Sequence, residues 1–164
     1  MHKSGLMVPA HGPAVYLMQS SEYLPNAGMA PKDSAWQLTE RKPRALVVDD
    51  APDIVHIFEV ILRHAGYDVV TKLSAPAALK AAQSERFDVV VSDIGMPGMN
   101  GYDLAEALRA LPDYGGVPMV AVTGFAKYED RNLALASGFD AHLMKPVVPT
   151  VLIELIKRLR QTPG

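Results

Sequence analysis

The sequence predicts an α/β protein in which a parallel sheet of five strands is covered by helices on both faces. Short β-branched runs, typical of strands buried on both faces, alternate five times with segments whose apolar residues recur at helical spacing. The connections between them are short, as in parallel sheets with crossover helices. At 164 residues, 49% hydrophobic and 21% charged, the chain has room for one such domain and a tail.

Residues 1–43 are predicted to be a poorly ordered tail that precedes the domain, which we place at residues 44–162. The tail contains five prolines, few charges and no sustained helical or strand period. Two apolar patches, residues 14–18 and Trp36, could dock on a partner or on the domain, but a short patch of this kind is more often incidental.

The first three strand–helix units follow the tail. Pro52 suits the first turn of a helix that Gly66 ends, Ser74 can cap the second helix, and a loop punctuated by Gly95 and Gly101 precedes the third. Strands are predicted at residues 45–48, 67–71 and 87–91, and helices at residues 52–65, 74–82 and 102–111.

The last two units have the same pattern. Strands are predicted at residues 117–122 and 141–144, and helices at residues 128–137 and 149–160. For five strands the best match is the flavodoxin-like order 2-1-3-4-5, with five helices in three layers, and ligands of such sheets gather at the carboxyl ends of the strands.

Composition excludes several classes of function. No apolar run approaches the roughly 20 residues that span a bilayer, and Pro9 and Pro13 interrupt any secretory signal. With 16 basic and 18 acidic residues, the chain has no general attraction to nucleic acid or to a membrane surface. Cysteine is absent, which excludes disulfides and thiolate chemistry. We expect a cytoplasmic protein.

Polar residues fall where the predicted strands end. Asp49 and Asp50 end the first strand, Asp93 the third, Thr123 the fourth and Lys145 the fifth. Parallel strands bring these ends to one edge, where carboxylates repel one another by about 1 kcal/mol per pair at 4 Å in water. An oxygen-only cluster of this kind favours a hard cation, with Mg²⁺ the best candidate.

This cluster suits the formation of an aspartyl phosphate. A carboxylate can attack phosphorus, and Asp93 is the candidate nucleophile. Lys145 and the metal would neutralise charge on the transferred phosphoryl oxygens, while the Thr123 hydroxyl could donate to one of them.

Each of these residues also has a simpler interpretation. Asp50, just ahead of Pro52, is by itself more often a helix cap, Thr123 a strand-to-loop hydroxyl and Lys145 a surface cation. His56 and His64 lie too far apart on the first helix to be a metal pair, so we expect them at the surface. The joint arrangement at one sheet edge favours the chemical interpretation.

The sequence resembles the response-regulator receiver family. The resemblance covers roughly residues 44–161 and is carried by four motifs in the family's order. They are LVVDD at 46–50, DIGMPGMNG at 93–101, VTG at 122–124 and KP at 145–146.

The resemblance implies a signalling role rather than an enzyme that acts on other molecules. Asp93 would take a phosphoryl group from a phosphohistidine on a sensor histidine kinase or a histidine phosphotransfer protein. Mg²⁺ would be held by Asp49, Asp50, Asp93 and the Gly95 carbonyl. Thr123 and Lys145 would respond, and the bond before Pro146 would be cis.

By the same resemblance, phosphorylation would switch a surface around the fourth helix, fifth strand and fifth helix toward an output partner that the sequence does not identify. A second copy of the chain, bound in a phosphorylation-dependent homodimer, is another possible partner.

Two departures from the family pattern carry expectations of their own. His142 stands where the family often has Tyr or Phe, so the switch is expected to be weaker or pH-sensitive, although a half-exposed histidine without a role explains the residue equally well. Gly95 and Phe125 offer no side chain to orient a hydrolytic water, which predicts a long-lived aspartyl phosphate.

The sequence also admits other functions. Because Gly164 closely follows the last helix, we expect no output domain, and the chain would be a stand-alone relay protein or the terminal receiver of a hybrid kinase. An interaction-only pseudo-receiver is a second class, which the intact acidic residues, Thr123 and Lys145 disfavour. A haloacid-dehalogenase-type phosphatase needs a second aspartate where Gly95 stands, so this class is disfavoured. The loop also lacks the Gly-Lys-Ser/Thr ending of a P-loop, which disfavours nucleotide hydrolysis.

Overall fold

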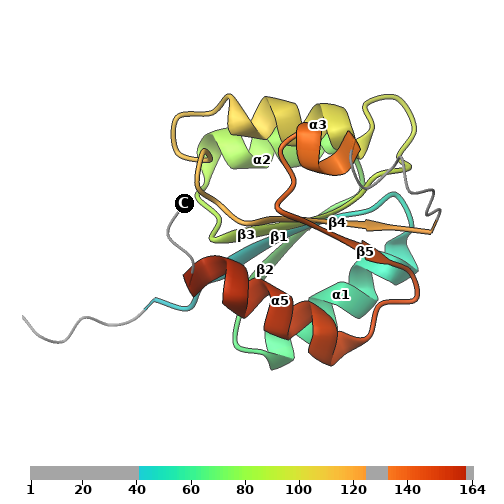
Figure 1. Cartoon of the computed structure of the whole chain (residues 1–164), viewed down its shortest axis with the longest axis vertical. Coiled ribbons are helices and arrows are strands. Elements are labelled where there is room, and N and C mark those ends of the chain that lie inside the picture. Colours follow the sequence, from blue (N-terminus) through green and yellow to red (C-terminus); the bar gives the residue numbers. More distant parts are fainter. Residues whose placement is uncertain (1–40, 125–132, 162–164) are drawn as a thin grey trace, which may run out of the picture. The chain divides into compact units, whose positions relative to one another are not determined.

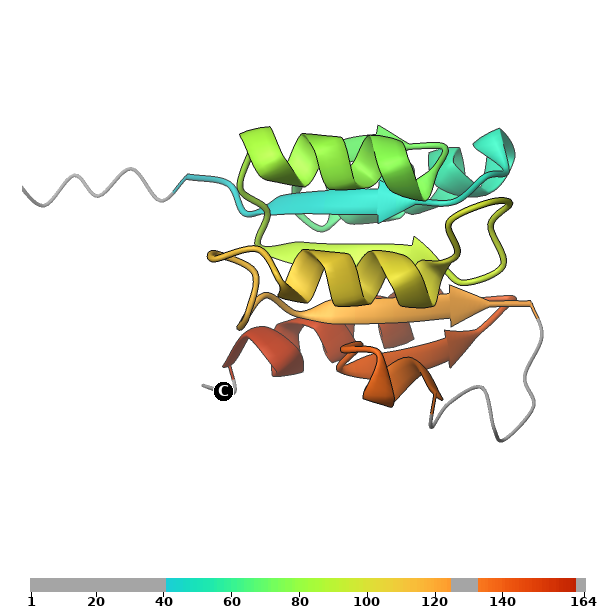
Figure 2. The same cartoon turned by 90° about the horizontal axis from the view of Figure 1, so that it is seen from above.

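The computed structural model describes residues 41–124 and 133–161, which form a five-stranded parallel sheet of order β2-β1-β3-β4-β5. The arrows of the sheet point the same way in Figure 2. This confirms the predicted fold class and strand order. The strands are β1 (Arg44–Val48), β2 (Asp68–Lys72), β3 (Val89–Asp93), β4 (Met119–Thr123) and β5 (Ala141–Met144).

Helices cover both faces of the sheet, with α2 and α3 on one side and α1 and α5 on the other (Figure 1). Their bounds are α1 (Pro52–His64), α2 (Ala75–Ser84), α3 (Gly101–Arg109) and α5 (Pro149–Gln161). Residues 133–136, between β4 and β5, are also helical. The predicted helix at 128–137 is therefore described only in its second half, and most of the predicted tail lies outside the described residues.

The core lies in two layers because the side chains of each strand alternate between the faces of the sheet. In β1, Leu46 and Val48 pack in the cluster beneath α2 and α3, while Ala45 and Val47 pack in the cluster beneath α1 and α5. Every residue of β3 and β4 is buried. The central strands therefore have nearly continuous apolar sequences.

Two strands begin later than predicted. β3 begins at Val89 and β4 at Met119, each two residues after its predicted start. Pro118 has no N–H to donate to a sheet, which explains the start of β4. Just before β3, the Asp88 carboxylate accepts the Arg44 backbone N–H at 2.6 Å, where the pairing of β1 with β3 begins. Strand β3 also ends two residues later than predicted, and Asp93 is its last residue.

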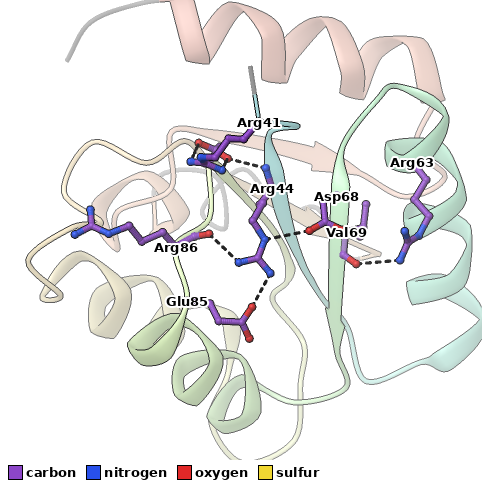
Figure 3. Close-up of polar contacts among 8 residues, drawn as sticks. Arg41, Arg44, Arg63, Asp68, Val69, Glu85 and Arg86 are labelled. Atoms are coloured by element: carbon purple, nitrogen blue, oxygen red, sulfur yellow. Dashed lines mark hydrogen bonds and ion pairs between the residues drawn. The ribbon is translucent and has the colours of Figure 1, made fainter. Parts of the chain in front are cut away.

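Charged side chains connect the amino ends of the first three strands (Figure 3). Arg44 is the first residue of β1. Its guanidinium contacts Asp68 of β2 at 3.1 Å and Glu85, which follows α2, at 2.5 Å. Both Nη groups of Arg41 donate hydrogen bonds to the Asp88 carboxylate at 2.9 Å. The segment that enters β1 is thus tied to the amino edge of the sheet, opposite the polar strand ends.

A groove of about 550 Å³ lies between α1 and α5 and includes Val60, Ile61 and Ile153 in its lining. The predicted site residues are not among those that line it. In the described part of the chain, no helix has the length and apolar character needed to cross a membrane. His56 and His64 are exposed on α1, as expected.

Candidate functional site

The structure brings four of the predicted site residues to the carboxyl edge of the sheet. Asp49 directly follows β1, Asp93 ends β3, Thr123 ends β4 and Lys145 follows β5. The two aspartates and the threonine are buried, with Asp49 2% and Asp93 8% exposed. Buried carboxylates at this edge need a positive charge close by.

Lys145 supplies that charge. Its Nζ donates to Asp49 Oδ2 at 2.6 Å and to Asp93 Oδ1 at 2.8 Å, so one ammonium bridges two carboxylates. Burial would lower the pKa of Lys145, but the hydrogen bonds with Asp49 and Asp93 outweigh it, and the pKa lies above its ordinary value. Lys145 therefore remains a cation throughout the physiological range.

Backbone groups hold the second oxygen of each carboxylate. The Ala51 N–H donates to Asp49 Oδ1 at 2.9 Å, and the Gly95 N–H donates to Asp93 Oδ2 at 2.6 Å. Because Gly95 is exposed and has no side chain, only backbone of this residue faces the Asp93 carboxylate. A Cβ at Gly95 would stand 3.4 Å from Asp93 Oδ2, so a side chain fits there.

Gly101 is required by a close backbone approach that the sequence did not reveal. A Cβ at this position would lie 2.3 Å from the Asp93 carbonyl oxygen and 2.7 Å from Ile94 Cα. The Gly101 N–H donates to the Ile94 carbonyl at 2.9 Å. The start of α3 therefore rests directly on the backbone of Asp93, and the capping box between Asn100 and Asp103 holds that start in place.

Thr123 and His142 lie on the neighbouring strands β4 and β5. The Thr123 carbonyl accepts the Lys145 N–H at 2.9 Å, which joins the hydroxyl-bearing residue to the lysine through the backbone. His142 is half-buried, pairs with Ala121 in the sheet register, and its Nε2 atom is inaccessible to solvent. The Lys145–Pro146 peptide bond is cis.

Asp50 is the predicted site residue that the structure does not bring to the others. It is exposed, and within residues 41–124 and 133–161 no three Asp, Glu, His or Cys side chains form a ready metal-binding group. The helix-cap interpretation of Asp50 is also wrong. The N-cap residue of α1 is Ala51, which has no side-chain acceptor, so no side chain caps this helix. The Ala51 N–H donates to the Asp49 carboxylate, not to Asp50.

The donor chemistry still fits a hard cation. Asp49 and Asp93 are oxygen donors held close enough to share one ammonium, and that ammonium shows that the pair needs a positive charge. Asp50 directly follows Asp49 in the chain and is exposed, so it is the third carboxylate next to this pair in the sequence. Phe125, the other position expected to affect hydrolysis, lies outside the described residues.

A parallel sheet of order 2-1-3-4-5, with two buried aspartates at strand ends and a lysine across them, defines the class of receiver domains of two-component signalling. The sequence model of the response regulator receiver domain matches residues 45–157. The chain belongs to this family, which consists of signalling domains rather than classical enzymes.

Relatives with known sequences agree with this assignment. An uncharacterized 14.6 kDa protein of Leptolyngbya boryana is 40% identical over 69% of this chain and 86% of its own length. The sensor protein GacS of Pseudomonas syringae and the transcriptional regulatory protein PrrA of Mycobacterium tuberculosis are each 36% identical. The chain spans 14% of GacS and 52% of PrrA, so receivers related to this chain occur within a sensor protein and within a regulator.

Solved structures give the same result. Chemotaxis protein CheY4 of Vibrio cholerae is 33% identical with a TM-score of 0.69, over 72% of this chain and 98% of the CheY4 chain. The receiver domain of sensor histidine kinase PA1611 from Pseudomonas aeruginosa is 28% identical with a TM-score of 0.69, over 74% and 99% of the two chains. That receiver was solved with a magnesium ion coordinated in its active-site cleft.

Proposed function

We propose that this receiver accepts a phosphoryl group on Asp93 from a phosphohistidine of a sensor histidine kinase or histidine phosphotransfer protein. The observation that carries the proposal is the Lys145 ammonium, which already lies 2.8 Å from Asp93 Oδ1 at the buried strand edge. A carboxylate oxygen would form the new bond to phosphorus while the phosphorus–nitrogen bond of the donor breaks. The electron pair of that bond stays on the imidazole nitrogen, which then takes a proton from solvent.

The chain's own residues have distinct parts in this transfer. The Gly95 N–H donates to Asp93 Oδ2, and Lys145 contacts Oδ1, so we propose Oδ1 as the oxygen that attacks phosphorus once Lys145 moves. Lys145 would follow the developing charge from the carboxylate to the phosphoryl oxygens, and Thr123 would donate its hydroxyl proton to one of them. We expect both movements to be short, because both residues lie at the carboxyl edge of the sheet.

Mg²⁺ is the cofactor that the donor set fits. Asp49, Asp50, Asp93 and the Gly95 carbonyl oxygen would hold it, once Asp50 turns inward and Lys145 leaves its position between the carboxylates. When bound, the ion neutralises negative charge on the transferred phosphoryl group.

The output of the proposed transfer is a change at the surface formed by residues 133–136, β5 and α5. This surface exposes aliphatic side chains, which suits the binding of a partner protein or of a second copy. They are Leu133, Leu135, Met144, Val148 and Val151. Thr123 ends β4, the strand between β3 and β5, and His142 belongs to β5 itself, so we propose these two as the switch residues.

Phosphoryl labelling tests the proposal. Purified chain would be incubated with acetyl phosphate and Mg²⁺, and the mass of the intact protein and of its Asp93 peptide would be measured. We expect one added phosphoryl group, which is lost with chelator and in Asp93→Asn. The matched control is Asp113→Asn, which replaces an exposed aspartate in the loop after α3 and should retain the label. Absence of labelling in the wild type, together with no response to beryllofluoride, would favour an interaction-only pseudo-receiver.

A further inference from the structure

Arg109, the last residue of α3, makes an unusually large set of contacts outside the site. Its Nε donates to the Gly138 carbonyl at 2.8 Å, and its Nη1 lies within 3.0 Å of the carbonyls of Tyr114, Gly115 and Val117. Its Nη2 donates to Asp140 Oδ2 at 2.8 Å. One guanidinium therefore joins the loop before β4 to the turn before β5.

The turn is shaped to receive this side chain. Gly138 has a φ of +104°, a conformation that other residues rarely adopt, and a Cβ there would lie 2.8 Å from Arg109 Cγ. The arginine stem thus packs flat against the glycine backbone. A larger residue at 138 would displace Arg109 even if the backbone conformation were kept.

Asp140 passes the restraint on to the paired strands. Its Oδ2 accepts the Met119 N–H at 2.7 Å, and its own N–H donates to the Met119 carbonyl at 2.8 Å. These two bonds close the amino end of the β4–β5 pair. At the carboxyl end the Lys145 N–H donates to the Thr123 carbonyl at 2.9 Å. The strand pair is therefore held at both ends, with the site at one of them.

Strand β5 depends on such restraints more than the central strands β3 and β4 do. It lies at the edge of the sheet and pairs only with β4. Its residues are half-buried or exposed, whereas those of β3 and β4 are all buried. Because apolar burial contributes less to holding β5 in the sheet, the position of this strand depends more on polar contacts.

We infer that Arg109 is a positioning residue for Lys145. By holding Gly138 and Asp140, it fixes where β5 begins, and with only four residues in β5 it thereby fixes where Lys145 emerges beside Asp49 and Asp93. The inference deepens the proposed phosphoryl transfer and rests on it for its consequence, although the positioning itself can be measured without any phosphorylation.

Amide hydrogen exchange tests the positioning directly. In Arg109→Gln we expect the Lys145 amide, which closes the carboxyl end of the β4–β5 pair, to lose about tenfold in protection. The Asp49 amide, which closes the β1–β2 pair by donating to the Lys72 carbonyl, should keep its protection within about twofold. A global loss of stability would lower both by the same factor.

Two further variants keep the test decisive. Arg109→Lys retains the charge but not the planar fork, so it should not restore the protection of the Lys145 amide. Arg86→Gln is the matched control, because Arg86 also pairs with one aspartate but at an exposed position, and it should leave both amides unchanged. If Arg109→Gln does not fold, Asp140→Asn, which keeps an acceptor for Met119, should give the same selective loss at smaller size.

The initial rate of Asp93 phosphorylation by acetyl phosphate gives the functional arm. We expect it to fall about tenfold in Arg109→Gln and to be unchanged in Arg86→Gln. Equal loss of protection at Lys145 and Asp49, or none at either, would overturn the inference, as would a selective loss with an unchanged rate. Selective loss in a chain whose wild type is never labelled would leave the positioning standing and refute the proposed function.

Discussion

Replacing Lys145 by methionine is expected to destabilise the fold, although the residue lies at the functional edge. The substitution removes the ammonium that contacts Asp49 at 2.6 Å and Asp93 at 2.8 Å, and leaves two carboxylates whose side chains are only 3% and 9% exposed. Removing one partner of a buried ion pair costs about 3–5 kcal/mol. Because Lys145 is itself 23% exposed, water enters part of the space, and we expect about 3 kcal/mol.

Urea unfolding at pH 7 in the presence of chelator would measure this loss. Lys80→Met, which removes an exposed lysine of α2, is the matched control and should change the free energy of unfolding by less than about 0.5 kcal/mol. A Lys145→Met protein within about 1 kcal/mol of the wild type would refute the reasoning, since the two carboxylates would then not need the ammonium.

The pH dependence of the same difference has a definite sign. The folded-state pKa of Lys145 lies above its ordinary value of 10.5, so its contribution is fully present below that pH. It is lost as the pH rises through the elevated folded-state pKa. The difference between wild type and Lys145→Met should therefore be constant from neutral pH into the mildly alkaline range and narrow only above pH 10.5. Narrowing already near neutral pH would contradict this account.

Added Mg²⁺ should reverse part of the loss. A ligand that binds only the folded state at a hundredfold excess over its Kd stabilises by about 2.7 kcal/mol. In Lys145→Met no ammonium competes for Asp49 and Asp93, so Mg²⁺ should stabilise this variant more than the wild type. Equal stabilisation of the two proteins would argue against a shared cation position.

Three further substitutions test the surroundings of the acceptor. Gly101→Ala should cost about 3 kcal/mol or more in urea unfolding, because its Cβ would collide with the Asp93 backbone at 2.3 Å; a loss below about 1 kcal/mol would show that α3 shifts freely. Asn100→Ala should cost about 1 kcal/mol by removing the cap of α3, and no change would mean that the cap is redundant. Gly95→Asn should shorten the lifetime of the Asp93 phosphate severalfold, measured by loss of label after gel filtration, whereas an unchanged decay would remove the predicted slowing.

Much of the fold was predictable because its signals are local. The β-branched runs of β1, β3 and β4 are buried on both faces, and the helical spacing of apolar residues matches the buried faces of α1 and α5. Ser74 was expected to cap α2, and its side chain does accept the Ala77 N–H. The prediction of strand starts at 87 and 117 was wrong by two residues, because hydrogen bonds at the amino edge and Pro118 decide where each ladder begins.

Local patterns predict the succession of strands and helices and the acidic, hydroxyl and basic residues that follow the strands, since alternation of strand and helix brings all these strand ends to one edge. Which of these residues contact one another depends on the packed fold. Lys145 lies 96 residues from Asp49 and 52 from Asp93 in the chain, yet bridges both, while the neighbouring Asp50 is exposed. Contacts between such distant residues, including those of Arg109, depend on packing geometry that no local pattern encodes.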